Sequence, residues 1–386
     1  MSDGTHGQRM GSRGRRRFSR VRSGRLHHRN GTSSRWRAFR YRKATAMSKA
    51  SEKRRETGPE PLFAEGVDAY LDRVTGISAQ TKSASSRERM RFGFRSYSAA
   101  MDDAPQDGLH RKNWYLACPG REIPLRLYRP EAGDDERLPT LIFFHGGGWV
   151  QGDLETHDTL AAELAAHAGI QVISVHYRRA PENRHPAAIE DGFEVLRWAI
   201  AEAASHAIDP GRIAVGGDSA GGFIAASLCH MARRLGLPAP CFQMLIYPAI
   251  TPDFSTESYR ENAAMPLLKT EDMKRYWSDY LPEGADPLAL ADMPAAASDL
   301  SGLPPALIVA AQYDPLLDDA TAYAGRLAGA GVPTRLTVVP GMLHGFLRAR
   351  SVSPPAEEVF RAVCGVIREA MHATMPTVEE IGGRRR

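Results

Sequence analysis

The sequence predicts an α/β fold, in which a mostly parallel central sheet carries helices on both faces. From residue 138 onward, short apolar runs rich in β-branched residues alternate with longer runs of helical periodicity. Runs such as 138–144 are apolar throughout, which is typical of strands buried on both faces. Of the 386 residues, 42% are hydrophobic and 25% are charged, the balance of an ordinary globular domain.

The same sequence excludes several other classes of protein. No apolar run approaches the length of a membrane span, so we expect no transmembrane helix. The cysteines are far apart and form no C-x-x-C pair, which indicates reduced thiols instead of a disulfide frame or a zinc site. We therefore expect a cytoplasmic protein without a metal.

The net charge of +5 hides an uneven distribution of charge along the chain. Residues 1–46 hold thirteen arginines and Lys43 against one acid, Asp3, whereas the remainder holds 36 basic and 44 acidic residues. The body is therefore acidic, and no nucleic-acid partner is expected for it. Residues 1–57 are predicted to be disordered, or translation starts at Met47, where the composition changes. A targeting role, or a basic arm on nucleic acid or lipid, is the remaining alternative.

The first structured part of the chain is predicted to be helical. Apolar residues recur at helical spacing on both sides of a polar stretch within residues 58–105. These helices either form part of a mobile lid or pack on the core. A β-hairpin follows, with strands at 114–118 and 123–128 and Pro119-Gly120 as its turn.

The alternating pattern then supplies the rest of the sheet within a domain predicted at 106–375. Strands are expected at 138–144, 171–177, 212–217, 242–247, 306–311 and 335–339. Helices are expected at 157–167, 186–207, 220–235, 316–330 and 355–372. Residues 250–300, rich in proline and aromatic residues, break the alternation and are predicted as an insertion that covers a pocket. Residues 376–386 are expected to be a solvated tail.

A glycine-rich turn at 217–221 has the G-x-S-x-G pattern of a nucleophile elbow. It joins the predicted strand 212–217 to the predicted helix 220–235. Glycines beside Ser219 let strand and helix approach closely and hold the serine in strained geometry. The hydroxyl is then presented at the edge of the sheet, and the Ala220 amide points toward an oxyanion formed there.

A second glycine-rich loop follows the strand 138–144. Three glycines after His145 leave backbone N–H groups unshielded, so these can turn toward a developing negative charge. We expect Gly146 and Gly147 to complete an oxyanion hole with Ala220. His145 is expected to brace the loop.

An acid and a base follow the last two predicted strands. Asp314 comes after strand 306–311, where its carboxylate can orient an imidazole; its alternative role is to cap the next helix. His344 comes after strand 335–339, on a loop between two glycines. The chain order Ser219, Asp314, His344 is the one that α/β-hydrolases use.

These motifs together resemble the hormone-sensitive-lipase group of carboxylesterases, which is known for its G-D-x-G signature. The motifs that carry the resemblance are His145-Gly-Gly-Gly-Trp149, Tyr177-Arg-Arg-Ala-Pro-Glu182, Gly217-Asp-Ser-Ala-Gly221, Tyr313-Asp-Pro-Leu316 and His344-Gly-Phe346. The resemblance implies an α/β-hydrolase fold with a helical cap near 60–105 and a second cap segment near 250–295. It also implies no cofactor, short or medium acyl esters as substrates, and a possible homodimer. Asp218 and Glu182 would be structural supports.

The sequence therefore predicts a serine carboxylester hydrolase acting on a small-molecule ester. Ser219 would attack the carbonyl, with His344 as base and Asp314 orienting it, and water would then cleave the acyl-enzyme. The same triad could also cleave an amide or a lactone. A non-catalytic binding protein built on the hydrolase fold is the alternative from another class, although receptors of that kind lack the catalytic histidine.

Overall fold

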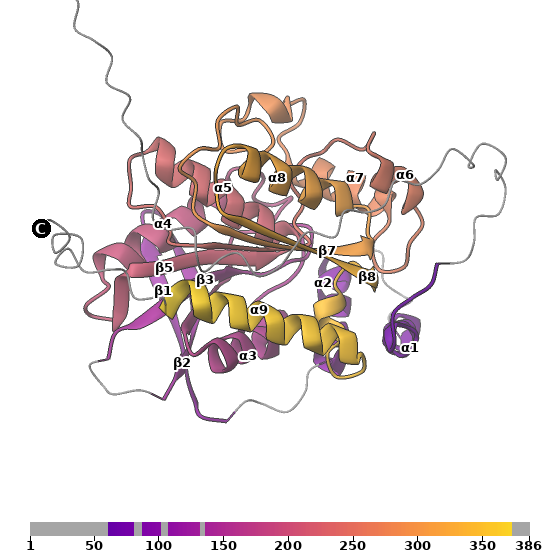
Figure 1. Cartoon of the computed structure of the whole chain (residues 1–386), viewed down its shortest axis with the longest axis horizontal. Helices are drawn as coiled ribbons and strands as arrows, with labels where there is room; N and C mark the ends of the chain where they lie inside the picture. The colour runs from indigo at the N-terminus through magenta and orange to yellow at the C-terminus, as the bar shows by residue number, and fades with distance from the viewer. Residues whose placement is uncertain (1–60, 81–86, 102–106, 132–135, 373–386) are drawn as a thin grey trace, which may run out of the picture. The chain divides into compact units, whose positions relative to one another are not determined.

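The computed structural model describes residues 61–80, 87–101, 107–131 and 136–372 (Figure 1). The chain divides into two units, Met1–Pro59 and Glu60–Arg386, and every described residue lies in the second. The predictions of a disordered segment at 1–57, a start at Met47 and a tail at 376–386 lie outside the described residues.

One eight-stranded sheet forms the centre of the described unit, in the order β1-β2-β4-β3-β5-β6-β7-β8. β1 pairs antiparallel with β2 and β2 antiparallel with β4, whereas all other pairs are parallel. The strands are β1 (Leu109–Cys118), β2 (Arg121–Pro130), β3 (Leu138–Phe144), β4 (Gln171–Val175), β5 (Ile208–Asp218), β6 (Gln243–Ile246), β7 (Ala306–Tyr313) and β8 (Thr334–Leu343). The prediction of a mostly parallel sheet is confirmed.

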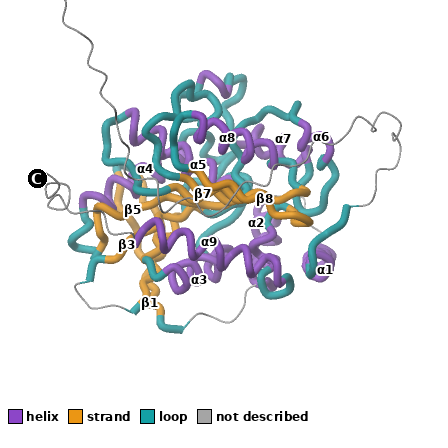
Figure 2. The backbone as a smooth tube through the Cα atoms, viewed as in Figure 1, coloured by secondary structure: helices purple, strands orange, loops and turns teal. Residues whose placement is uncertain are grey.

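Helices cover both faces of this sheet, as Figures 1 and 2 show. One apolar core lies beneath α4, α5 and α8, and a second beneath α3 and α9. The helices are α1 (Val67–Gln80), α2 (Arg87–Met101), α3 (Asp158–Ala168), α4 (Ala187–Ala201), α5 (Ala220–Arg234), α6 (Glu257–Glu261), α7 (Thr270–Tyr280), α8 (Leu317–Gly329) and α9 (Pro354–His372). Short 3₁₀ turns lie at η1 (Glu155–His157), η2 (Pro287–Ala289) and η3 (Phe346–Ala349). No helix within the described ranges is long and apolar enough to cross a membrane.

The predicted helix 186–207 is too long at its C-terminal end. α4 ends at Ala201, and residues 202–207 form turns. Ala207 adopts φ 50°, and the next amide, of Ile208, donates to Ala203 O at 2.8 Å. The helix itself closes at Glu202, which has φ −102° and whose amide donates to Trp198 O, and no glycine or proline marks this end in the sequence.

The N-terminal helices and the insertion pack on opposite sides of the strand ends. Val67 and Tyr70 of α1 and Met101 of α2 belong to the core that α3 and α9 cover. In the insertion, α7 packs on the glycine-rich loop that follows β3: the ring centroid of Trp149 lies 4.4 Å from Trp277 and 4.5 Å from Tyr280. Both segments thus contact the loops at the carboxyl edge of the sheet.

Candidate active site

Ser219 lies at the turn between β5 and α5, in a strained backbone conformation with φ 55° and ψ −117°. The turn is very tight: a Cβ atom added to Gly217 would lie 2.4 Å from Phe144 O, and one added to Gly221 would lie 1.9 Å from the same oxygen. Real Cβ atoms essentially never approach so closely. The Ser219 amide donates to Ile246 O at 2.8 Å, which ties the turn to β6.

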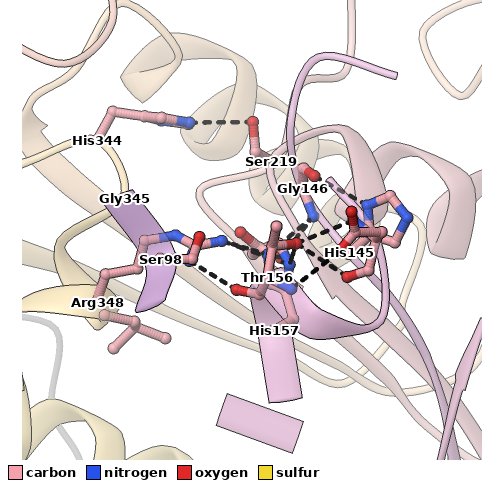
Figure 3. Close-up of polar contacts among 12 residues, drawn as sticks. Ser98, His145, Gly146, Thr156, His157, Ser219, His344, Gly345 and Arg348 are labelled. Atoms are coloured by element: carbon pink, nitrogen blue, oxygen red, sulfur yellow. Dashed lines mark hydrogen bonds and ion pairs between the residues drawn. The ribbon is translucent and has the colours of Figure 1, made fainter. Parts of the chain in front are cut away.

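Three side chains from separate strand ends form one hydrogen-bonded chain. His344 Nε2 lies 3.0 Å from Ser219 Oγ, a contact that Figure 3 shows. His344 Nδ1 lies 2.7 Å from Asp314 Oδ2. Since a carboxylate accepts, Nδ1 carries the proton and Nε2 offers its lone pair to the serine hydroxyl.

Asp314 serves two neighbours at once. Its Oδ1 accepts from the Leu316 amide at 2.8 Å, so the carboxylate also closes the turn before α8. Its own carbonyl accepts from Asn262 Nδ2 at 3.1 Å, and Asp314 is only 1% exposed. The two roles that the sequence allowed for this aspartate, orienting a histidine and capping a turn, are compatible.

One of the amides predicted for the oxyanion hole has another partner. The Gly146 N–H donates to Asp218 Oδ1 at 2.8 Å, so it is not directed at an oxyanion, and the prediction for this amide needs correction. Gly147 and Gly148 have φ 120° and 59°, and a Cβ atom on Gly148 would lie 2.4 Å from the Tyr276 ring. Within the described residues, the amides of Gly147, Gly148 and Ala220 have no hydrogen-bond acceptor.

His145 and Asp218 support this loop from below. The His145 ring is buried and stacks on Tyr177 with ring centroids 4.3 Å apart, and its Nδ1 lies 3.0 Å from Gly146 O. Burial holds the pKa of His145 well below its usual value, so the ring is neutral. Burial would raise the pKa of Asp218, but the groups around it, among them Arg348 and the Gly146 amide, hold it far below the ordinary value.

Glu182 lies farther from the serine and binds helix α2. Arg91 of α2 donates to both carboxylate oxygens, at 3.0 and 2.7 Å, and this hydrogen bonding lowers the pKa of Glu182. Arg91 also donates to Val150 O at 2.7 Å and to Ala180 O at 3.1 Å. The segment 177–182 therefore joins α2 to the glycine-rich loop.

Two residues near Asp218 carry no signal in the sequence: His157, which is buried and contacts the carboxylate, and Arg348, which contacts His157. His157 Nε2 lies 3.1 Å from Asp218 Oδ1, and Arg348 Nη2 lies 2.7 Å from His157 Nε2. His157 was predicted only as the start of a helix, and Arg348 follows His344 without any motif of its own. Nothing in the spacing indicates that residues 191 positions apart would meet. Among the described residues, no group of three or more His, Cys, Asp or Glu side chains could hold a metal ion.

The fold and this site define a class of protein, the α/β-hydrolases, and a family model described as alpha/beta hydrolase fold matches residues 141–348. Carboxylesterase NlhH of Mycobacterium tuberculosis is 42% identical over 259 residues, which cover 65% of this chain and 80% of the relative. Esterase LipI of the same organism is 37% identical over 324 residues, 81% of this chain and 95% of its own. The chain belongs to the carboxylesterases of the hormone-sensitive-lipase type within the α/β-hydrolase family.

Solved structures show the same likeness. An ester-hydrolase from the metagenome of Lake Arreo is 36% identical, with a TM-score of 0.75, over 81% of this chain and 100% of that one. An esterase of Pyrobaculum calidifontis is 33% identical, with a TM-score of 0.71, over 78% and 97%. The protein is thus a serine ester hydrolase acting on small molecules.

Proposed function

We propose that this protein hydrolyses short- and medium-chain carboxylic esters through an acyl-enzyme on Ser219. The observation that carries the proposal is the hydrogen-bonded chain from Ser219 Oγ through His344 to Asp314, with distances of 3.0 and 2.7 Å. In the first step His344 Nε2 takes the hydroxyl proton while Oγ attacks the ester carbonyl. The imidazolium then protonates the departing alkoxide, so that an alcohol leaves.

The second step mirrors the first. Water enters, His344 takes one of its protons, and the hydroxide attacks the acyl carbonyl. Ser219 leaves as the alkoxide, recovers the proton from His344, and a carboxylic acid is released. The Asp314 carboxylate stabilises the imidazolium in both steps because it accepts the Nδ1 proton throughout.

The oxyanion of each tetrahedral intermediate is assigned to the amides of Gly147, Gly148 and Ala220. Gly148 takes the place of Gly146 in the predicted set because the Gly146 amide is bound to Asp218. Positive φ at Gly147 and Gly148 turns their peptide groups in a way that residues with side chains rarely adopt. One such donor contributes about 3–4 kcal/mol to stabilising the transition state.

The expected acyl chain is short because aromatic side chains from the insertion occupy the space beside the loop. Tyr276 of α7 packs on Gly148, and its hydroxyl accepts from Gln151 Nε2 at 2.9 Å. A relative from Pseudomonas putida, 39% identical over 242 residues, is named ethyl acetate hydrolase, and ethyl acetate is a short ester. Both observations favour acetyl to hexanoyl esters over long-chain ones.

The test is turnover of p-nitrophenyl esters from acetyl to palmitoyl by the wild type and two variants. We expect a maximum at short or medium chains, and a loss of about 10⁴-fold or more in kcat for Ser219→Ala and His344→Ala. Ser227→Ala, a buried serine on α5 away from the turn, is the matched control and should keep its rate. A folded wild type that cleaves no ester of the series contradicts the proposal.

A further inference from the structure

We propose that Arg348 is a positioning residue for ester hydrolysis: from the far side of His157 its positive charge balances that of Asp218 beneath the glycine-rich loop, and its other contacts link this region to helix α2. The inference rests on the proposed function and concerns residues outside the triad and the oxyanion donors. Figure 3 shows Arg348 beside Ser98, Thr156 and His157.

Arg348 is fully engaged by groups from two elements. Its Nη1 donates to Ser98 Oγ of α2 and to Thr156 O, each at 2.9 Å. Its guanidinium also lies over two aromatic rings of α2, 4.8 Å from the Phe94 centroid and 5.6 Å from the Tyr97 centroid. An arginine held by a planar fork of hydrogen bonds and by stacking has a single orientation.

The second nitrogen of this guanidinium determines how His157 is protonated. Thr156 Oγ1 donates to Asp153 O and accepts from the Asp153 amide, both at 2.9 Å. Its remaining lone pair can therefore only accept from His157 Nδ1, 2.8 Å away. His157 is then neutral with its proton on Nδ1, and Nε2 is an acceptor that receives the Arg348 Nη2 proton at 2.7 Å.

This assignment changes how the charge of Asp218 is balanced. With Nε2 as an acceptor, His157 has no proton to give Asp218 Oδ1, 3.1 Å away. The Gly146 amide supplies the hydrogen bond, and Arg348 supplies the positive charge on the other side of the imidazole. Asp218 directly precedes Ser219, so one buried carboxylate fixes both the glycine-rich loop and the nucleophile turn. Without Arg348, both would lose the counter-charge that holds them together.

The same arginine follows His344 by four residues, so α1 and α2 hold the base as well. Tyr70 of α1 donates to Gly345 O at 3.2 Å, and its hydroxyl is also hydrogen-bonded to that of Tyr97. The cap helices therefore contact the segment that bears His344 and, through Arg348, the segment that bears Ser219. A shift of α2 would move both catalytic groups.

The experiment compares Arg348→Met and Arg348→Lys with Arg350→Met. Arg350 is the matched control because it also pairs with an acid, Glu163 at 2.8 Å, and also stacks on a ring, Phe360 at 4.7 Å, but contacts no residue of the site. kcat and KM for p-nitrophenyl butyrate are measured from pH 4.5 to 8, beside the urea midpoint of each variant.

We expect Arg348→Met to lower kcat about tenfold or more while KM changes little, because catalytic groups are displaced and the binding surface is not. Removal of the positive Arg348 raises the pKa of both Asp218 and His157. When the solution is acidified, the variant should therefore lose activity at a higher pH than the wild type does. The other ionisable groups facing this pair, unchanged in every variant, are His145, Asp153, Tyr97, Tyr177 and Tyr247. Arg348→Lys should recover part of kcat and the wild-type acid limb.

Arg350→Met should lose stability without either kinetic effect. If Arg348→Met matches Arg350→Met in kcat and in its acid limb, Arg348 is a stabilising residue only and the inference is overturned. Should Arg348→Met not fold, Arg348→Lys decides: an unchanged kcat overturns the inference, and a reduced kcat at an unchanged KM supports it. A wild type inactive on every ester overturns the proposed function itself, whereas an active wild type with unaffected Arg348 variants overturns this inference alone.

Discussion

Asp314 uses both of its carboxylate oxygens, and an amide in its place can satisfy only one partner correctly. In Asp314→Asn the remaining oxygen can accept from the Leu316 amide, which leaves the NH₂ group facing His344 Nδ1. The imidazole would then carry its proton on Nε2 and could no longer accept one from Ser219. We expect kcat to fall by about 10⁴-fold, with little loss of stability.

The measurement is kcat on p-nitrophenyl butyrate beside the melting temperature. Asp318→Asn is the control: the Asp318 side chain accepts from the Ser258 amide at 2.9 Å and does not reach the histidine. Equal rates for the two variants would show that Asp314 has no orienting role.

Gly221 tolerates no side chain, because the atom that a Cβ would meet is backbone. Gly221→Ala would place a methyl group 1.9 Å from Phe144 O, and neither β3 nor the turn can move away without breaking the sheet. We expect a loss of at least about 1–3 kcal/mol, and loss of activity with it. Gly365→Ala in α9, where nothing lies within 4 Å, should instead stabilise by about 0.5–1 kcal/mol. The expected result is a urea midpoint below that of the wild type for Gly221→Ala and above it for Gly365→Ala.

At the level of elements, α7 supports the glycine-rich loop through its aromatic face. Trp277 lies 4.4 Å from Trp149 and 5.4 Å from Phe223, centroid to centroid. Trp277→Ala should cost about 3–5 kcal/mol and also lower kcat, because Trp149 ends the loop whose amides are proposed to bind the oxyanion. The variant is examined by urea unfolding and by kcat.

Phe360→Ala separates these two effects. Phe360 is fully buried on α9, under the other face of the sheet, so it should lose a similar free energy of unfolding at an unchanged kcat. If Trp277→Ala loses stability but keeps kcat, α7 acts only as a cover for the core.

Across the whole molecule, one buried acid makes stability depend on pH. Burial, aided by Asp314 and Asp318, raises the pKa of Asp319 to about 8 although the Ile250 and Thr251 amides lower it. The folded protein therefore binds a proton here that the unfolded chain, with a pKa of about 3.9, releases. The contribution of Asp319 to stability therefore falls as the pH rises between about 4 and 8, by up to ~1.4 kcal/mol per unit.

Asp319→Asn removes this titration and keeps an oxygen for the two amides, which lie 2.7 and 3.0 Å from Oδ2. The variant should be the more stable protein at pH 8, with a difference that shrinks toward pH 5. Asp253→Asn, an exposed site, should show no such trend. If the free energies of unfolding of Asp319→Asn and wild type differ by the same amount from pH 5 to pH 8, Asp319 is charged over that whole range.

The sequence allowed the sheet, the elbow and the order of Ser219, Asp314 and His344 to be predicted because each depends on local pattern. Two kinds of feature lay beyond it. Which glycine amide is free depends on the side chain of Asp218, 72 residues beyond Gly146, and three identical glycines give no hint of it. Arg348 and His157 meet only because η3 and η1 lie together in space, which no periodicity encodes.

The order of the strands has a practical consequence. β5, which ends at the nucleophile turn, has four strands on one side and three on the other among those described. Its amides should exchange with solvent deuterium only when the whole sheet opens, whereas those of β1 should exchange through local fraying. We therefore expect Ser219 to stay in place while the edge strands of the sheet open locally. A covalent serine-reactive probe applied during heating would accordingly count folded molecules, and its labelling curve should coincide with global unfolding.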